Sequence, residues 1–316
     1  MYGKGFRVIF VQNNMATREN HTGVVNVATV PKRSPFRYPG GKTWLIPTVR
    51  RWLRSLPGTP KLLVEPFAGG GIVGLTAAFE ELAREVLLVE KDPDVATVWN
   101  TIISTDGGPW LARRIRTFRC TRDNVQAALA IASESLRVRA FQTILRNRVQ
   151  RGGIMAPGAG LVKAGENGRG VASRWYPETL SRRILDIVMI KSRLRFIEGN
   201  GLDVITRNRK RPDVVFFVDP PYTVAGARLY RFSDIDHEDL FSRMSLVSGD
   251  FLLTYDDSNE IRALATRFGF GLETIPMKNT HHSIQFELLI GRNLGWLRRG
   301  ATFESARQAD LRTALM

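Results

Sequence analysis

Residues 62–74 read LLVEPFAGGGIVG, and this stretch decides the fold. Leu62–Val64 is a short apolar run, typical of a strand that is buried on both faces. Gly69–Gly74 then satisfies the spacing G-x-G-x-x-G and opens a predicted helix, and Val86–Val89 is a second apolar run. A strand, a glycine turn, a helix and a second strand form a βαβ unit. We therefore predict an α/β fold with a parallel sheet.

The glycine turn predicts a nucleotide-like ligand. Small residues let the backbone approach such a ligand closely, and Glu90, at the end of the second predicted strand, can accept hydrogen bonds from ribose hydroxyls. Asp92 is the neighbouring carboxylate and the second choice for this role. Because the same geometry serves NAD, FAD and S-adenosylmethionine (SAM), the turn indicates an adenosine-bearing ligand without naming it.

The most specific motif is Asp219-Pro220-Pro221-Tyr222, at the end of the apolar run Val214–Val218. Two consecutive prolines stiffen the backbone and remove two N–H donors, which leaves a carboxylate, carbonyl oxygens and an aromatic ring. Asp219 and the carbonyl of Pro220 can accept both hydrogens of an exocyclic amine while Tyr222 stacks on the planar base. These acceptors would free the lone pair of the amine nitrogen for direct attack on a methyl sulfonium.

The spacing of the motifs and the charge of the chain indicate a nucleic-acid-binding insert. The chain has 316 residues, enough for about two domains, and a formal net charge of +16, which favours a polyanionic partner. The glycine turn and Asp219 are further apart than strand–helix units require, so we place an insert at 107–190. We expect helices over Val125–Leu145 and Pro177–Ser192, with the glycine-rich stretch Gly152–Ser173 between them.

Arginines of this insert are candidate DNA contacts, because a guanidinium binds phosphate groups and guanine edges bidentately. The candidates are Arg146, Arg148, Arg151, Arg169, Arg174, Arg182 and Arg183. We expect base-reading side chains among the first five, which lie around the glycine-rich stretch, and phosphate contacts from Arg182 and Arg183.

Three motifs in this order resemble those of the Dam-like (D12 class) DNA adenine-N6 methyltransferases: Tyr38-Pro39-Gly40-Gly41-Lys42, Glu65–Gly71 and Asp219–Tyr222. The resemblance covers roughly residues 35–293 and includes Phe286–Ile290. It implies an α/β, Rossmann-like SAM-dependent methyltransferase sheet with an inserted, mostly helical target-recognition domain. It also implies SAM as the cofactor and double-stranded DNA as the partner.

The resemblance assigns roles to individual residues. The methyl-transfer centre would consist of Asp219, Pro220, Pro221 and Tyr222. The cofactor would be bound by Tyr38, Gly41, Lys42, Phe67, Gly69, Gly71, Glu90 and Asp219. Either Asn200 or Asp203 would contact the adenine of SAM. The family usually carries Asp where Glu90 stands, which departs from the pattern at the ribose position.

These observations give a domain prediction and several exclusions. We expect a SAM-binding catalytic domain over 31–106 and 191–293, a DNA target-recognition insert over 107–190, an N-terminal extension over 1–30 whose composition is compatible with disorder, and a C-terminal tail over 294–316. The single cysteine, Cys120, excludes an intrachain disulfide, and His281-His282 lacks spaced partner ligands, so no metal site is expected. No apolar run approaches the length of a membrane span and no signal-peptide pattern is present, which favours a cytoplasmic protein.

Other functions stay open on the sequence alone. The same catalyst could act on cytosine N4 in DNA or on adenine in RNA, although Asp before the two prolines favours adenine. A NAD-dependent oxidoreductase would explain the glycine turn and Glu90, but it would leave Asp219–Tyr222 and the basic insert without a role. A DNA-binding protein without catalysis would leave Asp219–Tyr222 unexplained as well.

Overall fold

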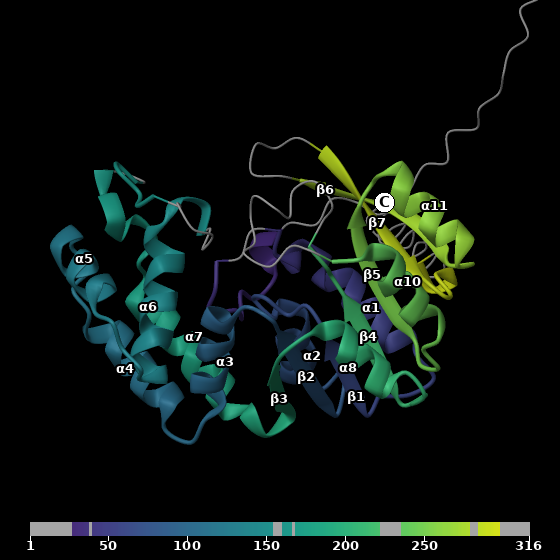
Figure 1. Cartoon of the computed structure of the whole chain (residues 1–316), viewed down its shortest axis with the longest axis horizontal. Coiled ribbons are helices and arrows are strands. Elements are labelled where there is room, and N and C mark those ends of the chain that lie inside the picture. Colours follow the sequence, from purple (N-terminus) through teal and green to yellow (C-terminus); the bar gives the residue numbers. More distant parts are fainter. Residues whose placement is uncertain are drawn as a thin grey trace, which may run out of the picture.

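The computed structural model describes residues 27–37, 40–153, 160–165, 168–221, 235–278 and 284–297 (Figure 1). Tyr38, Tyr222 and His281-His282 lie outside the described residues, as do nearly all of the expected N-terminal extension and most of the expected C-terminal tail.

Seven strands form one sheet in the order β3-β2-β1-β4-β5-β7-β6. The strands are β1 (Leu62–Glu65), β2 (Glu85–Glu90), β3 (Leu194–Glu198), β4 (Val214–Val218), β5 (Phe251–Asp256), β6 (Gly271–Lys278) and β7 (Ile284–Gly291). Strands β1 to β5 are parallel, and β7 is antiparallel to β5 and to β6. Without β7, this is the order 3-2-1-4-5-6 of the doubly wound nucleotide-binding fold. The predicted Rossmann-like α/β sheet is therefore confirmed.

Helices cover both faces of the sheet. One face is covered by α1 (Ile46–Ser55), α2 (Ile72–Phe79) and α3 (Pro93–Ile103), with the short 3-10 helix η2 (Lys42–Leu45) leading into α1. The other face is covered by α8 (Gly201–Asn208), α10 (His237–Ser245) and α11 (Asn259–Arg267). Among the described helices, none combines the length and the apolar composition that a membrane span requires.

Alternate residues of each central strand enter two separate cores. In β4, Val215 and Phe217 pack on the side of α1 to α3, whereas Phe216 and Val218 pack on the side of α8, α10 and α11. Successive side chains of a strand point to opposite faces. A strand covered on both faces therefore reads as an uninterrupted apolar run, as the sequence of β4 does.

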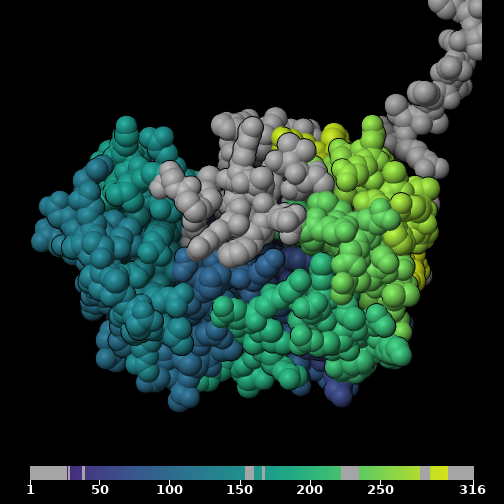
Figure 2. All heavy atoms as spheres, viewed as in Figure 1, coloured from purple at the N-terminus to yellow at the C-terminus, as the bar shows by residue number. Residues whose placement is uncertain are grey.

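Among the described residues, four α-helices lie between α3 and β3 in the chain and form one side of the molecule, shown in blue and teal in Figures 1 and 2. They are α4 (Gly107–Thr117), α5 (Arg122–Ala130), α6 (Leu136–Val149) and α7 (Pro177–Met189), and the 3-10 helices η3 (Arg151–Gly153), η5 (Gly170–Arg174) and η6 (Lys191–Arg193) border them. Helix α4 packs on α7, and α6 packs on α3. The segment is thus attached to the sheet through α3.

The stretch Val125–Leu145, predicted to be helical, contains two helices with a break between them. The chain leaves the helical path after α5 and starts α6 at Leu136. The side chain of Gln142, on α6, donates to the carbonyl oxygens of Ala128 and Ile131 at 2.9 Å and 2.7 Å. These bonds satisfy carbonyl groups at the end of α5, where no further helical turn follows. The predicted helix Pro177–Ser192 is also shorter than expected and ends at Met189.

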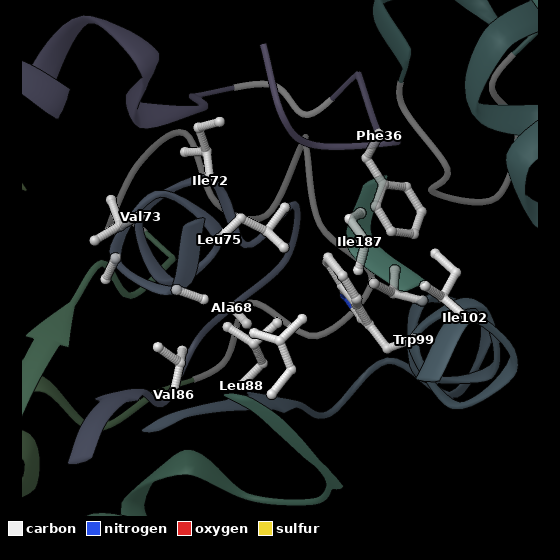
Figure 3. Packing of buried hydrophobic residues seen from close by; sticks show 14 of the residues in the cluster. Phe36, Ala68, Ile72, Val73, Leu75, Val86, Leu88, Trp99, Ile102 and Ile187 are labelled. Atoms are coloured by element: carbon white, nitrogen blue, oxygen red, sulfur yellow. The ribbon is translucent and has the colours of Figure 1, made fainter. Parts of the chain in front are cut away.

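Trp99, on α3, connects the glycine turn to the helices beyond it. Its ring lies beside Ile102 and Ile187 and near Phe36 (Figure 3), whose ring centroid is 5.9 Å away. Its Nε1 donates to the carbonyl oxygen of Gly69 at 3.0 Å. The turn is therefore held by the same buried side chain that packs against α7.

Candidate active site

A cavity of about 1070 Å³ lies at the carboxyl ends of the parallel strands. The residues that follow β1, β2, β3 and β4 line it, as ligand sites do in open α/β sheets. Gly41, Phe67, Gly69 and Gly71, which the resemblance assigns to the cofactor, all line this cavity. It also extends to α6 and α7, so the sheet and the inserted helices share one cavity.

The glycine turn has the backbone that its sequence predicts. Gly69 and Gly71 have φ angles of 46° and 61°, in the left-handed region that favours glycine. A Cβ atom on Gly71 would lie 3.0 Å from the ring of Trp99, and one on Gly74 would lie 2.6 Å from Leu88 Cδ2. Gly71 and Gly74 are therefore required by helix–sheet packing, whereas Gly69 shapes the turn itself.

Glu90 closes the turn from the neighbouring strand. One carboxylate oxygen accepts the N–H of Gly69 at 2.8 Å, and the other accepts the N–H groups of Lys91 and Asp92 at 2.8 Å and 2.9 Å. Burial raises the pKa of Glu90 to about 7, although these hydrogen bonds oppose the rise. Since a carboxylate has about four acceptor positions, one remains for a ligand hydroxyl. Asp92 instead caps α3, where it accepts the N–H of Asp94 at 2.8 Å.

Asp219 follows β4 and is held by two groups from other parts of the chain. One of its carboxylate oxygens lies 3.0 Å from Lys42 Nζ and accepts the hydroxyl of Thr254, on β5, at 2.8 Å. Lys42 Nζ also donates to the carbonyl oxygen of Gly40 at 3.1 Å and lies 3.5 Å from the carboxylate of Glu287, on β7. An ammonium group has three donors, and three acceptors of the protein surround this one. Lys42 therefore positions Asp219 from within the protein.

The charge balance around Lys42 favours its ammonium form. Burial alone would lower the pKa of Lys42, but the carboxylates of Asp219 and Glu287 outweigh it, and the pKa is raised above its usual value. Lys42 and Glu287 are both nearly inaccessible to solvent. A buried cation between two carboxylates is a fixed element of the site.

Three further residues of this site were not identified from the sequence. Thr254 and Glu287 contact the Asp219–Lys42 pair, and Glu65, which is buried at the end of β1, accepts the N–H of Gly74 at 2.7 Å. Burial raises the pKa of Glu65 to about 8, with a smaller contribution from the charge of Asp219. The sequence offered one signal for Glu287: it is a charged residue in a mostly apolar strand. Because a buried charge requires a partner, such a residue indicates an ion pair.

The structure separates the two candidates after β3. Asn200 lines the cavity and caps α8, where its side chain accepts the N–H of Leu202 at 3.0 Å. Asp203 is exposed in the first turn of α8 and does not line the cavity. Asn200 is thus the candidate that a bound cofactor could reach. Pro220 and Pro221 also line the cavity, next to Asp219.

The seven candidate arginines occupy different environments. Arg148, Arg174 and Arg183 line the cavity. Arg146 lines a separate shallow pocket together with Asp94. The remaining three, Arg151, Arg169 and Arg182, are exposed. The sequence predicts all seven side chains as DNA contacts. In the structure, three of them line the cavity and the other four lie outside it.

Comparisons with known proteins give a likeness of fold at low similarity. No protein-family model and no curated protein matches the chain. Among solved structures, the rRNA methyltransferase aviRa from Streptomyces viridochromogenes is 12% identical, with 81% of this chain and 86% of that chain covered and a TM-score of 0.40. A methyltransferase from Geobacter sulfurreducens is 13% identical, with 78% and 76% covered and a TM-score of 0.34. A SAM-dependent methyltransferase from Agrobacterium tumefaciens is 9% identical, with 79% and 61% covered and a TM-score of 0.37.

Proposed function

We propose that the protein transfers a methyl group from SAM to N6 of adenine in double-stranded DNA, as its resemblance to the Dam-like enzymes implies. The observation that supports this most directly is the position of Asp219. Its carboxylate lines the same cavity as the glycine turn and Glu90, and Lys42 and Thr254 hold it at 3.0 Å and 2.8 Å. An acceptor for an amine and a candidate nucleoside site therefore share one cavity.

The residues that line the cavity fit the chemistry of SAM. The glycine turn offers close backbone approach, Glu90 has an acceptor position for a ribose hydroxyl, and Asn200 stands at the next strand end. SAM, when bound, supplies an electrophilic methyl group on a sulfonium sulfur. The acidic groups at the strand ends favour such a cation.

The residues of the chain then position the amine. The Asp219 carboxylate accepts one hydrogen of N6, and the carbonyl of Pro220 is the neighbouring acceptor for the other. Neither proline has an N–H that would compete. As the bond between N6 and the methyl group forms, the sulfur–methyl bond of SAM would break and the neutral thioether S-adenosylhomocysteine would leave. N6 would also lose one proton, and the Asp219 carboxylate is the acceptor in hydrogen-bond contact. Lys42 and Thr254 keep this carboxylate in place, so positioning and electrostatics carry the rate enhancement.

The target adenine has to leave the helix to reach this cavity, because its N6 is paired and stacked within duplex DNA. A mismatch opposite the adenine removes part of that cost. We therefore expect duplexes with a mismatched target adenine to bind more tightly than fully paired ones.

The decisive experiment is methyl transfer from isotope-labelled SAM to double-stranded DNA and to RNA, followed by digestion and identification of the methylated nucleoside. We expect N6-methyladenine in DNA. Asp219→Asn should lower the rate by about 100-fold or more, since one charged acceptor of the transition state is lost. Asp213→Asn, an exposed change before the same strand, serves as the control. Methylated cytosine, methylation of RNA alone, or full activity of Asp219→Asn would contradict the proposal.

A further inference from the structure

The cavity lining combines a group of arginines with acidic residues at the strand ends. We call this group of side chains the basic wall: Arg37, Arg148, Arg174 and Arg183. Arg148 belongs to α6, Arg183 to α7, and Arg174 ends η5 just before α7. The sulfonium and the amine of SAM favour the acidic groups of the cavity, and its single carboxylate does not account for the whole wall. Arg148 and Arg183, which donate to backbone carbonyl groups, can therefore bind another anion.

Backbone carbonyls, and not carboxylates, hold two of these arginines. Arg148 Nη2 donates to the carbonyl oxygen of Pro35 at 2.5 Å, and Arg183 Nη1 donates to that of Ser34 at 3.3 Å. Among the described residues, no ion pair neutralises either side chain, and Arg148 Nε is buried without a hydrogen-bond partner. Burial, followed by the charges of Arg183 and Arg37, lowers the pKa of Arg148 to about 9. Burial also lowers the pKa of Arg183. An anion between these groups would relieve the repulsion.

The side chain of Asn147 links the backbone at Arg37 to the backbone at Gly153. It accepts the N–H of Arg37 at 2.7 Å and donates to the carbonyl oxygens of Arg37 and Gly153 at 2.9 Å and 3.0 Å. A Cβ atom on Gly153 would lie 2.4 Å from the Arg37 carbonyl oxygen, so the two segments are in close contact. The backbone at Arg37 and beside Arg148 is therefore fixed before any ligand binds, which reduces the entropy lost on binding.

An aromatic ring stands beside these cations. Tyr176 lies between η5 and α7, lines the cavity, and is 41% exposed. Arg148, Arg174 and Arg183 line the same cavity as this ring. Cationic groups that bind phosphate next to an aromatic face are the combination that binds an unstacked nucleotide.

We propose that the basic wall binds the backbone phosphate of the nucleotide whose base enters the cavity, and that Tyr176 stacks at the cavity mouth. This inference rests on the proposed function for the identity of the base, but the anion site stands independently of methyl transfer. The proposed site gives the arginines of the insert different roles. Arg148, Arg174 and Arg183 contact the extruded nucleotide, whereas the exposed Arg182 does not.

The test uses deoxyadenosine 3′,5′-bisphosphate as the probe, with deoxyadenosine and inorganic phosphate as comparison ligands, at constant ionic strength and without SAM. Binding is measured by calorimetry on the full chain. We expect the bisphosphate to bind more tightly than either comparison ligand. Arg183→Gln should weaken it about tenfold, as the loss of one charge-assisted hydrogen bond predicts. Arg182→Gln, which removes the same charge from the next residue of the same helix, should change it less than twofold.

A folding control and two further variants complete the design. Circular dichroism and thermal melting establish that Arg183→Gln is folded. Arg183→Lys should recover part of the affinity for the bisphosphate, because it restores the charge. Tyr176→Ala should weaken the binding of the bisphosphate and leave the binding of inorganic phosphate unchanged.

Several results would overturn the inference. Equal losses in Arg182→Gln and Arg183→Gln would show general attraction by net charge, and equal affinity for inorganic phosphate and the bisphosphate would show a simple anion site. A loss of SAM affinity in Arg183→Gln, with unchanged bisphosphate binding, would assign the wall to the cofactor carboxylate. Because no methyl transfer occurs in these assays, a failure here is distinct from a failure of the proposed function.

Discussion

Lys42 is a cation whose neighbours at hydrogen-bond distance include the carboxylate that the proposed chemistry uses. At 3.0 Å from Asp219 and 3.5 Å from Glu287, it balances two negative charges in a region with little access to water. Lys42→Met should therefore destabilise the protein by about 3–5 kcal/mol at pH 7, because the buried Glu287 and the partly buried Asp219 lose their counterion. Urea unfolding measures this loss. Lys61→Met, at an exposed position, should have little effect.

The loss should depend on Glu287, because Glu287 is the second carboxylate beside Lys42. Glu287→Gln in the same chain as Lys42→Met should therefore restore part of the stability at pH 7. A loss of stability that is the same with and without Glu287→Gln would refute the pairing.

Glu90 predicts a pH dependence of cofactor binding. Its pKa is raised to about 7, and only the ionised carboxylate accepts a ribose hydroxyl without competition from its own proton. As the pH falls from 8 to 6, the ionised fraction decreases and the affinity for SAM should fall up to about tenfold. Calorimetric titrations at several pH values measure this, and Glu90→Gln should abolish the step. An affinity independent of pH in the unmodified protein would argue against contact with Glu90.

The sequence predicts individual residues unevenly, and the reason is physical. Gly69 and Glu90 belong to a local motif in which a few adjacent residues fix the geometry. The contacts of Lys42 with Asp219 and Glu287 join residues more than 170 positions apart, and only the order of the strands brings them together. Arg148 was predicted as a DNA contact, but the sequence did not reveal that it is buried against Pro35.

At the scale of elements, the buried strands could be predicted from the sequence, whereas the edge strand β6 could not. The apolar runs of β1, β2 and β4 report burial on both faces. By contrast, β6 has mixed polarity and contains Pro276, which argues against an interior strand. It forms the edge of the sheet and pairs with β7 alone, and an edge strand tolerates proline. The sequence did not predict β6 for this reason.

Helix α3 links the glycine turn to α7 through Trp99. Trp99→Phe keeps an apolar ring in the core but removes the donor to the Gly69 carbonyl, so it should cost about 1–3 kcal/mol of stability. It should also weaken SAM binding, because the turn loses a constraint. Denaturant unfolding and calorimetry measure the two effects.

Trp52→Phe, in the buried face of α1, is the matched control for Trp99→Phe. This variant should lose stability while keeping the affinity for SAM. If both variants bind SAM like the unmodified protein, Trp99 does not support the ligand site.

At the scale of the whole molecule, one apolar core joins the sheet to the inserted helices. Leu63 and Val86 of the sheet belong to the same buried cluster as Phe141 of α6 and Ile184 of α7. We therefore expect one cooperative unfolding transition in calorimetry, with equal calorimetric and van't Hoff enthalpies. Phe141→Ala should lower the stability of this single transition by about 3–5 kcal/mol. Two resolved transitions, with only one shifted, would show that the inserted helices unfold independently.

The position of β7 has a consequence for the synthesis of the protein. Since β7 lies between β5 and β6, a growing chain produces β6 before the strand that holds it exists, and the two join the sheet together as a hairpin. Glu287 belongs to β7 and is therefore part of that hairpin. An incomplete chain on the ribosome can thus contain the glycine turn and its contact with Glu90. The charge arrangement around Lys42 and Asp219 is complete only when β7 has been synthesised. Truncated translation products would lack it.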